Sequence, residues 1–112
     1  MKEILVKLLK ADVIVMASPV YFYTINAQMK TLIDRIVPQY TNLSNKEFYF
    51  IITAAETDLN MMEKSIECFR GLLDCLENPN EKGVIYGVGA WQKGEIKGTK
   101  AMKEAYEMGK NV

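Results

Sequence analysis

The chain has 112 residues, of which 49% are hydrophobic and 25% charged, as in a single globular domain. Fourteen basic residues balance fourteen acidic ones and no basic stripe carries interleaved aromatics, which argues against a nucleic-acid or membrane-surface partner. No apolar run is long enough to span a bilayer and the N-terminus lacks a secretory pattern, so we expect a cytoplasmic protein.

The first half of the chain predicts a helix, a strand and a second helix. Residues 2–10 carry apolar side chains at the spacing of one helical stripe. The run Val13–Ala17 has no polar alternation, which is typical of a strand covered on both faces in a parallel sheet. Thr24 or Asn26 is the N-cap of a helix that runs to about Val37 and stops near Pro38.

The second half continues the alternation of strands and helices. Its patterns predict, in order, a polar loop over 39–46, a buried strand over 48–53, a long helix over 59–76, a strand over 84–89, a loop over 90–98 and a helix over 99–108. Strands that alternate with helices indicate right-handed βαβ crossovers and a parallel sheet of about three strands. We therefore predict one α/β domain over residues 1–112.

The two cysteines, Cys68 and Cys75, lie seven residues apart within the predicted long helix, about 10 Å along its axis. This separation disfavours a disulfide, and buried free thiols are the simpler interpretation. Because the chain has no histidine and no Cys-x-x-Cys pair, the usual ligands of zinc and iron–sulfur sites are missing. The sequence predicts no metal site.

The segment Ala17–Tyr23 is the densest candidate for a binding site. It follows the first predicted strand, and ligands of open α/β sheets bind beyond the carboxyl ends of the strands. Pro19 restricts the turn, and three consecutive aromatic residues at 21–23 offer flat surface for a planar ring. The alternative is that these aromatics only close the end of the sheet.

The sequence from Asp12 to Phe22, together with Ala27–Arg35, resembles the flavodoxin-like FMN reductases and the related iron–sulfur flavoproteins. The stretch Gly87–Ile96 and the last helix also look like the C-terminal part of that family. The resemblance implies a three-layer α/β/α fold in which the sheet corresponds to strands 3, 4 and 5 of the family. It also implies FMN as cofactor, NAD(P)H as electron donor, and a quinone, a flavin or another small molecule as acceptor.

Two loops match the family's flavin site, although Ala54 and Ala55 stand where relatives often carry glycine. Carried over by resemblance, the cofactor-binding residues are Ser18, Pro19, Val20, Tyr21, Phe22, Thr53, Ala54, Ala55 and Glu56. Glu56 is more simply an exposed loop acid or an acid at a helix start than a catalytic residue. No residue is expected to act as a catalytic acid, base or nucleophile, because the cofactor carries the chemistry.

Other residues leave alternatives open. Lys30 and Asp34 form an i, i+4 ion pair or, with Arg35, contribute to a dimer surface like that of the family. Trp91 covers the flavin, covers a partner subunit or packs on the final helix.

The resemblance also shows what the chain lacks. The family's first strand, its phosphate-binding loop and its second strand have no counterpart, so we expect a truncated domain. Losing three charge-assisted hydrogen bonds to phosphate, at about 1.5–3 kcal/mol each, predicts weak or negligible FMN binding. The strand Val13–Ala17 would have a free edge, and we expect a second copy to cover it in a homodimer. The alternative function is a non-catalytic remnant that acts only through self-association or protein binding.

Overall fold

The computed structural model describes all residues from 1 to 112. Its helices and strands are α1 (Lys2–Lys10), β1 (Val13–Tyr21), β2 (Thr24–Ile25), α2 (Ala27–Asp34), β3 (Glu47–Ala54), α3 (Glu63–Asp74), β4 (Asn80–Val88) and α4 (Lys100–Lys110). Three short 3₁₀ helices cover Val37–Asn42, Leu59–Met62 and Glu95–Gly98. No helix is both long enough and apolar enough to cross a membrane.

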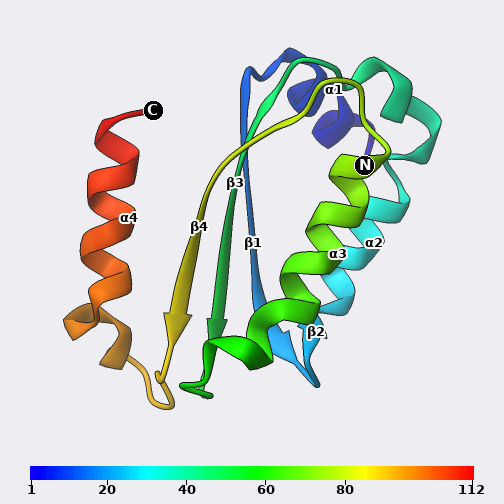
Figure 1. Ribbon diagram of the computed structural model, residues 1–112. Coiled ribbons are helices and arrows are strands. Elements are labelled where there is room, and N and C mark those ends of the chain that lie inside the picture. Colours follow the sequence, from blue (N-terminus) through cyan, green and yellow to red (C-terminus); the bar gives the residue numbers. More distant parts are fainter.

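The strands form one sheet in the order β2-β1-β3-β4, with β1, β3 and β4 parallel (Figure 1). This confirms the predicted parallel α/β arrangement. Strand β2 pairs antiparallel with the end of β1, with Val20 opposite Ile25 and Tyr21 opposite Thr24. The sequence did not predict β2, because two residues are too few to show an alternating pattern.

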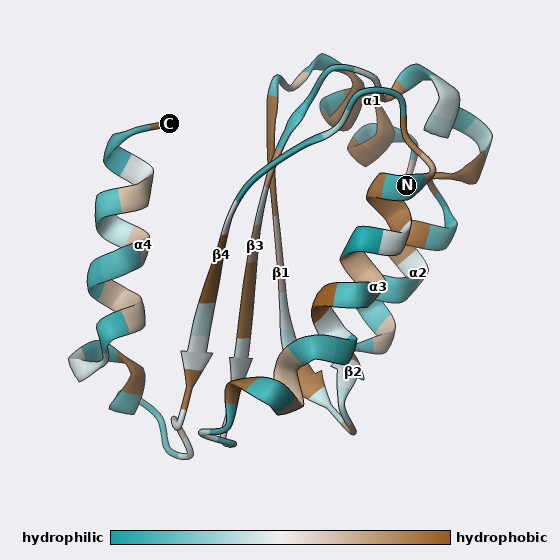
Figure 2. Cartoon of the chain, in the orientation of Figure 1, coloured by the Kyte–Doolittle hydropathy of each residue, from teal (hydrophilic) through white to brown (hydrophobic).

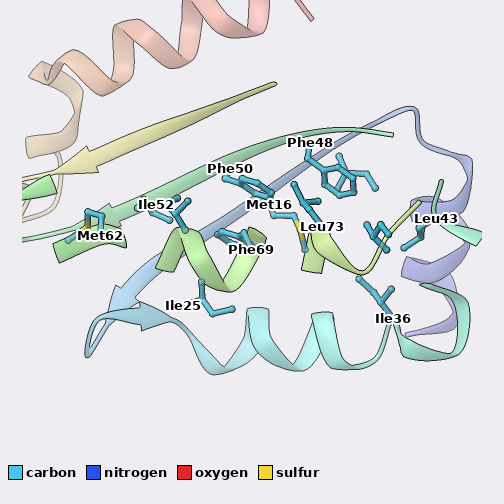
Figure 3. Close-up of a cluster of buried hydrophobic side chains, with 13 residues drawn as sticks. Met16, Ile25, Ile36, Leu43, Phe48, Phe50, Ile52, Met62, Phe69 and Leu73 are labelled. Atoms are coloured by element: carbon cyan, nitrogen blue, oxygen red, sulfur yellow. The ribbon is translucent and has the colours of Figure 1, made fainter. Parts of the chain in front are cut away.

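The main core lies between the sheet and the helices α1, α2 and α3, which share one side of the sheet (Figure 1). Every second side chain of β3 enters this core, and Phe50 stacks on Phe69 of α3 with ring centroids 4.6 Å apart (Figure 3). The other labelled members of Figure 3 come from β1, β2, β3, α3 and the segments flanking α2 and α3. Burial of these side chains fixes which face of each strand points inward.

The opposite face of the sheet is only partly covered, by α4 (Figure 1). Helix α4 packs along β4, where the side chain of Met108 comes so close to Gly83 that a Cβ there would lie 2.7 Å from it. On this face of β1, Val15 is 56% exposed and Ala17 is also exposed. The expectation that Val13–Ala17 is covered on both faces was therefore wrong, because α4 does not extend across to β1.

Several boundaries differ from those predicted. The polar stretch 39–46 is not wholly loop, since Val37–Asn42 forms a 3₁₀ helix. The predicted helix 59–76 begins with a 3₁₀ turn, and β4 starts four residues earlier than expected. Parallel pairing with β3 imposes extended geometry on the polar residues of β4, from Asn80 onward (teal in Figure 2).

One buried cation joins α1 to the rest of the core. The side chain of Lys46 is 7% exposed, and its ammonium group donates hydrogen bonds to the carbonyl oxygens of Leu9, at 3.0 Å, and Ala11. These carbonyls belong to the last turn and C-cap of α1, which carry the negative end of the helix dipole. Lys46 thus satisfies carbonyl groups that the helix itself leaves without a donor.

We expect Lys46→Met to lower the free energy of unfolding by about 2 kcal/mol, because it removes charge-assisted hydrogen bonds to these carbonyls. Urea denaturation followed by circular dichroism measures the change. Lys10→Met, which removes an exposed cation from α1, is the control and should change the free energy of unfolding by less than about 0.5 kcal/mol. Equal stability of the two variants would contradict a structural role for Lys46.

Candidate functional site

The carboxyl ends of β1, β3 and β4 meet at one edge of the sheet (Figure 1). The pairing register places Pro19 of β1 opposite Thr53 of β3, and Thr53 opposite Gly87 of β4. The segments that follow these strands therefore lie next to each other. This edge is where open α/β sheets bind ligands.

A two-residue hairpin turn, Phe22–Tyr23, joins β1 to β2. Both residues have positive φ, 50° for Phe22 and 72° for Tyr23, as the central positions of a type I′ turn require. Such positions favour Gly, Asn and Asp, and a bulky side chain there is strained. Phe22 is also 99% exposed, so packing does not compensate for its conformation. Strained backbone of this kind occurs preferentially at functional sites.

Ser18 holds the base of this hairpin. Its side chain is buried, and its hydroxyl donates to the carbonyl oxygen of Pro19 at 2.8 Å and accepts from the backbone N–H of Asn26 at 2.9 Å. Asn26 is in turn the N-cap of α2, where its side chain accepts from the N–H of Met29. The hairpin is thus fixed between the end of β1 and the start of α2.

The segment after β3 provides the facing wall of the site. The carboxylate of Glu56 accepts hydrogen bonds from the N–H groups of Thr57 and Asp58, at 2.9 and 3.1 Å. The loop after β4 is tied to the same segment, because Gly89 donates to the carbonyl of Glu56 and Ala90 to that of Ala54. Glu56 is thus an exposed acid in the loop before the 3₁₀ turn Leu59–Met62, whose N-cap is Asp58.

Between the two walls lies a cavity of about 260 Å³. Seven of its eight lining residues are hydrophobic, and the set consists of Val20, Phe22, Tyr23, Ala54, Ala55, Glu56, Met61 and Met62. Aromatic rings and polarizable methionine sulfurs pack well against a flat conjugated ring. Glu56 is the only charged residue in the lining, so the cavity suits a neutral aromatic group better than an anion.

The structure brings together five of the nine predicted binding residues in this cavity: Val20, Phe22, Ala54, Ala55 and Glu56. Ser18 supports the turn from within the fold, and Pro19, Tyr21 and Thr53 lie in the strands beside the cavity without lining it. Sequence reasoning missed Met61 and Met62. The 3₁₀ turn Leu59–Met62 folds them back over the site, and their spacing gave no signal beyond an ordinary helix.

A larger cavity, of about 510 Å³, lies between α2 and α3. It is remote from the carboxyl ends of the strands, being lined by the helices and by the 3₁₀ segment after α2. Its lining includes no strained backbone position. We therefore assign the candidate site to the smaller cavity at the sheet edge.

The remaining candidate residues lie outside this cavity. Lys30 and Asp34 form the predicted i, i+4 ion pair, exposed on α2. Trp91 is 81% exposed, so it does not pack on the final helix. Both cysteines are free, but only Cys68 is partly buried, and Cys75 is exposed at the C-cap of α3. The prediction of two buried thiols was wrong for Cys75, because α3 ends there.

A parallel α/β sheet with a cavity at the carboxyl ends of its strands is typical of open α/β folds, among which is the flavodoxin-like fold. The family model described as NADPH-dependent FMN reductase matches residues 1–80. This chain belongs to that family. A search of curated proteins gives no significant match.

Solved structures agree with the fold. The chain is similar to the Trp repressor binding protein of Bacillus subtilis, with a TM-score of 0.80 and 18% identity over 93% of this chain and 72% of that one. It is also similar to an NADH:FMN oxidoreductase, EMOB, with a TM-score of 0.66 and 17% identity. That match covers 92% of this chain but only 56% of the oxidoreductase.

We expect Phe22→Asn to raise the free energy of unfolding by about 1 kcal/mol, because Asn tolerates positive φ and the exposed phenyl ring loses little packing. Thermal and urea unfolding measure the effect. Tyr21→Asn is the matched control: Tyr21 is also exposed but lies in strand β1, where Asn is unfavourable, so this variant should lose stability. A destabilised Phe22→Asn would contradict the assignment of strain.

Proposed function

We propose that this chain forms the ring-binding edge of an FMN-dependent NAD(P)H oxidoreductase. The observation that carries the proposal is the apolar cavity between the strained turn Phe22–Tyr23 and the segment after β3. Membership of the FMN reductase family supports it. The two free cysteines are compatible with the reducing cytoplasm, which we propose as its compartment.

The described residues fit the ring of a flavin better than its phosphate. Phe22, Tyr23, Met61 and Met62 supply apolar and aromatic contacts to a flat ring. No lysine or arginine lines the cavity, and Glu56 would repel a phosphate placed there. The cavity thus offers apolar contacts to a ring and no charge-assisted contact to an anion.

A bound flavin would supply the chemistry of the proposed reaction, the transfer of hydride from NAD(P)H and of electrons to a small acceptor such as a quinone or a free flavin. The protein's part is to orient the ring and to exclude water from one side of it. The rigid hairpin performs the first task, since hydrogen bonds of Ser18 and Asn26 fix its base before a ligand arrives. Met61, Met62 and Val20 perform the second by lining the cavity with apolar surface.

We expect this chain to bind riboflavin and FMN weakly and with dissociation constants within about threefold of each other, since the phosphate meets no cation in the cavity. Titration of flavin fluorescence measures both constants. Glu56→Gln should improve FMN binding more than riboflavin binding by removing the repulsion. Tight stoichiometric binding of FMN, with riboflavin far weaker, would contradict this assignment.

Oxidation of NADH or NADPH that depends on added flavin would support catalysis by this chain. A colourless preparation that neither binds flavin nor oxidises either nucleotide would instead favour the alternative of a non-catalytic remnant acting through self-association or protein binding. The free edge of β1 is the observation that favours self-association. Residues 13–19 pair with β3 on one side and have no strand on the other.

We propose that a second copy covers this edge in a homodimer. Because the edge carries neither a charged side chain nor a proline from Val13 to Ser18, nothing in this part of it opposes strand pairing. We expect light scattering to show a dimer at micromolar concentration, and Val15→Lys to convert it to monomer. Val37→Lys, at an equally exposed apolar residue beside the α2–α3 cavity, is the control. If only Val37→Lys converted the dimer to monomer, the interface would lie on the helices α2 and α3 and not on β1. A wild-type protein that is monomeric at micromolar concentration would refute the dimer.

A further inference from the structure

The strained turn is anchored to α3 as well as to its own strands. The hydroxyl of Ser65 donates a hydrogen bond to the carbonyl oxygen of Tyr23, at 3.2 Å. Ser65 is fully buried, at 0% exposure, and stands 42 positions from Tyr23 in the sequence. Beside it, the ammonium group of Lys64 lies 5.2 Å from the centre of the Tyr23 ring, within the range of a cation–π contact.

A serine in this place is not explained by the helix alone. Serine is a weaker helix former than alanine, and within a helix its hydroxyl commonly bonds a carbonyl of the preceding turn. In α3 the hydroxyl of Ser65 instead donates to the carbonyl oxygen of Tyr23 in the hairpin turn. It is the only side-chain hydrogen bond between α3 and the turn Phe22–Tyr23.

This hydrogen bond joins the two walls of the candidate site. Tyr23 belongs to the hairpin wall, while Met61 and Met62 belong to the facing wall and directly precede α3. Ser65 lies in the first turn of α3, so it is connected through the helix backbone to the facing wall, which contains Met61 and Met62. Its hydroxyl is hydrogen-bonded to the hairpin wall at Tyr23. Without this bond, the strain at Tyr23, with φ of 72°, would favour movement of the turn away from α3.

We propose that Ser65 is a positioning residue for the flavin ring, which sets the separation of the two walls and holds Tyr23 in its strained conformation. The inference rests on the proposed function for its ligand. Its structural part, the anchoring of the turn, can be tested without any ligand. Ser65 itself does not line the cavity, so its effect on binding must pass through the turn.

The experiment measures amide hydrogen exchange of residues 21–25 in Ser65→Ala and titrates the same protein with riboflavin. We expect exchange in the turn to accelerate about five- to tenfold and riboflavin affinity to fall by a similar factor, about 1–1.4 kcal/mol at 1.4 kcal/mol per decade. Exchange in β3 and β4 should not change. Ser65→Cys keeps the side-chain shape and a weak donor, so it should recover part of both effects.

Ser44→Ala removes a half-buried hydroxyl before β3, at the opposite end of that strand, and is the matched control. Unchanged exchange of the turn in Ser65→Ala overturns the proposal, as does faster exchange with unchanged riboflavin affinity. If the wild-type chain binds no riboflavin, the proposed function fails, and the exchange result alone decides whether Ser65 holds the turn. The two failures are therefore distinguishable.

Discussion

The parallel pairing of β1 with β3 places Pro19 opposite Thr53, and the candidate site depends on that register. With this pairing, the hairpin that follows β1 faces the segment that follows β3 across a cavity of about 260 Å³. A slip of one residue would turn Phe48, Phe50 and Ile52 out of the core, so packing against α3 enforces the register. The same hydrophobic contacts that stabilise the fold thus determine the geometry of the site.

The hairpin combines local strain with strong local anchoring. Two aromatic residues adopt positive φ, and one of them is almost fully exposed. Two side chains hold the segment: the Ser18 hydroxyl bonds the backbone groups of Pro19 and Asn26, and the Ser65 hydroxyl donates to the carbonyl oxygen of Tyr23. A surface held in this way is preorganised, so a flat ligand need not supply the free energy of ordering it. This arrangement is more consistent with binding than with simple closure of the sheet end.

The two faces of the sheet are covered by helices to different extents, and the edge formed by β1 is only partly covered by a neighbouring strand. One face is covered by three helices, whereas the other is covered by α4 alone, which packs on β4 and leaves β1 exposed. Most residues of α4 are hydrophilic (Figure 2). Val15 remains half exposed on that face, and the neighbouring edge of β1 lacks a strand. An apolar strand without a partner is prone to pair with another chain. The uncovered part of β1 and the candidate site lie on different parts of the same strand, so pairing of β1 with a second chain would not block the cavity.

The sequence by itself determined the alternation of strands and helices, the parallel sheet and the family, because apolar periodicity and the run from Ser18 to Phe22 are local signals. It also located five of the residues that line the cavity. Only the tertiary structure decided that Ser18 supports the turn, that Met61 and Met62 close the site, and that Ser65 bonds Tyr23. Those roles arise from contacts between segments far apart in the chain, and spacing along a sequence does not record such contacts. The exposure of Val15 was decided in the same way, because it depends on how far α4 reaches across the sheet.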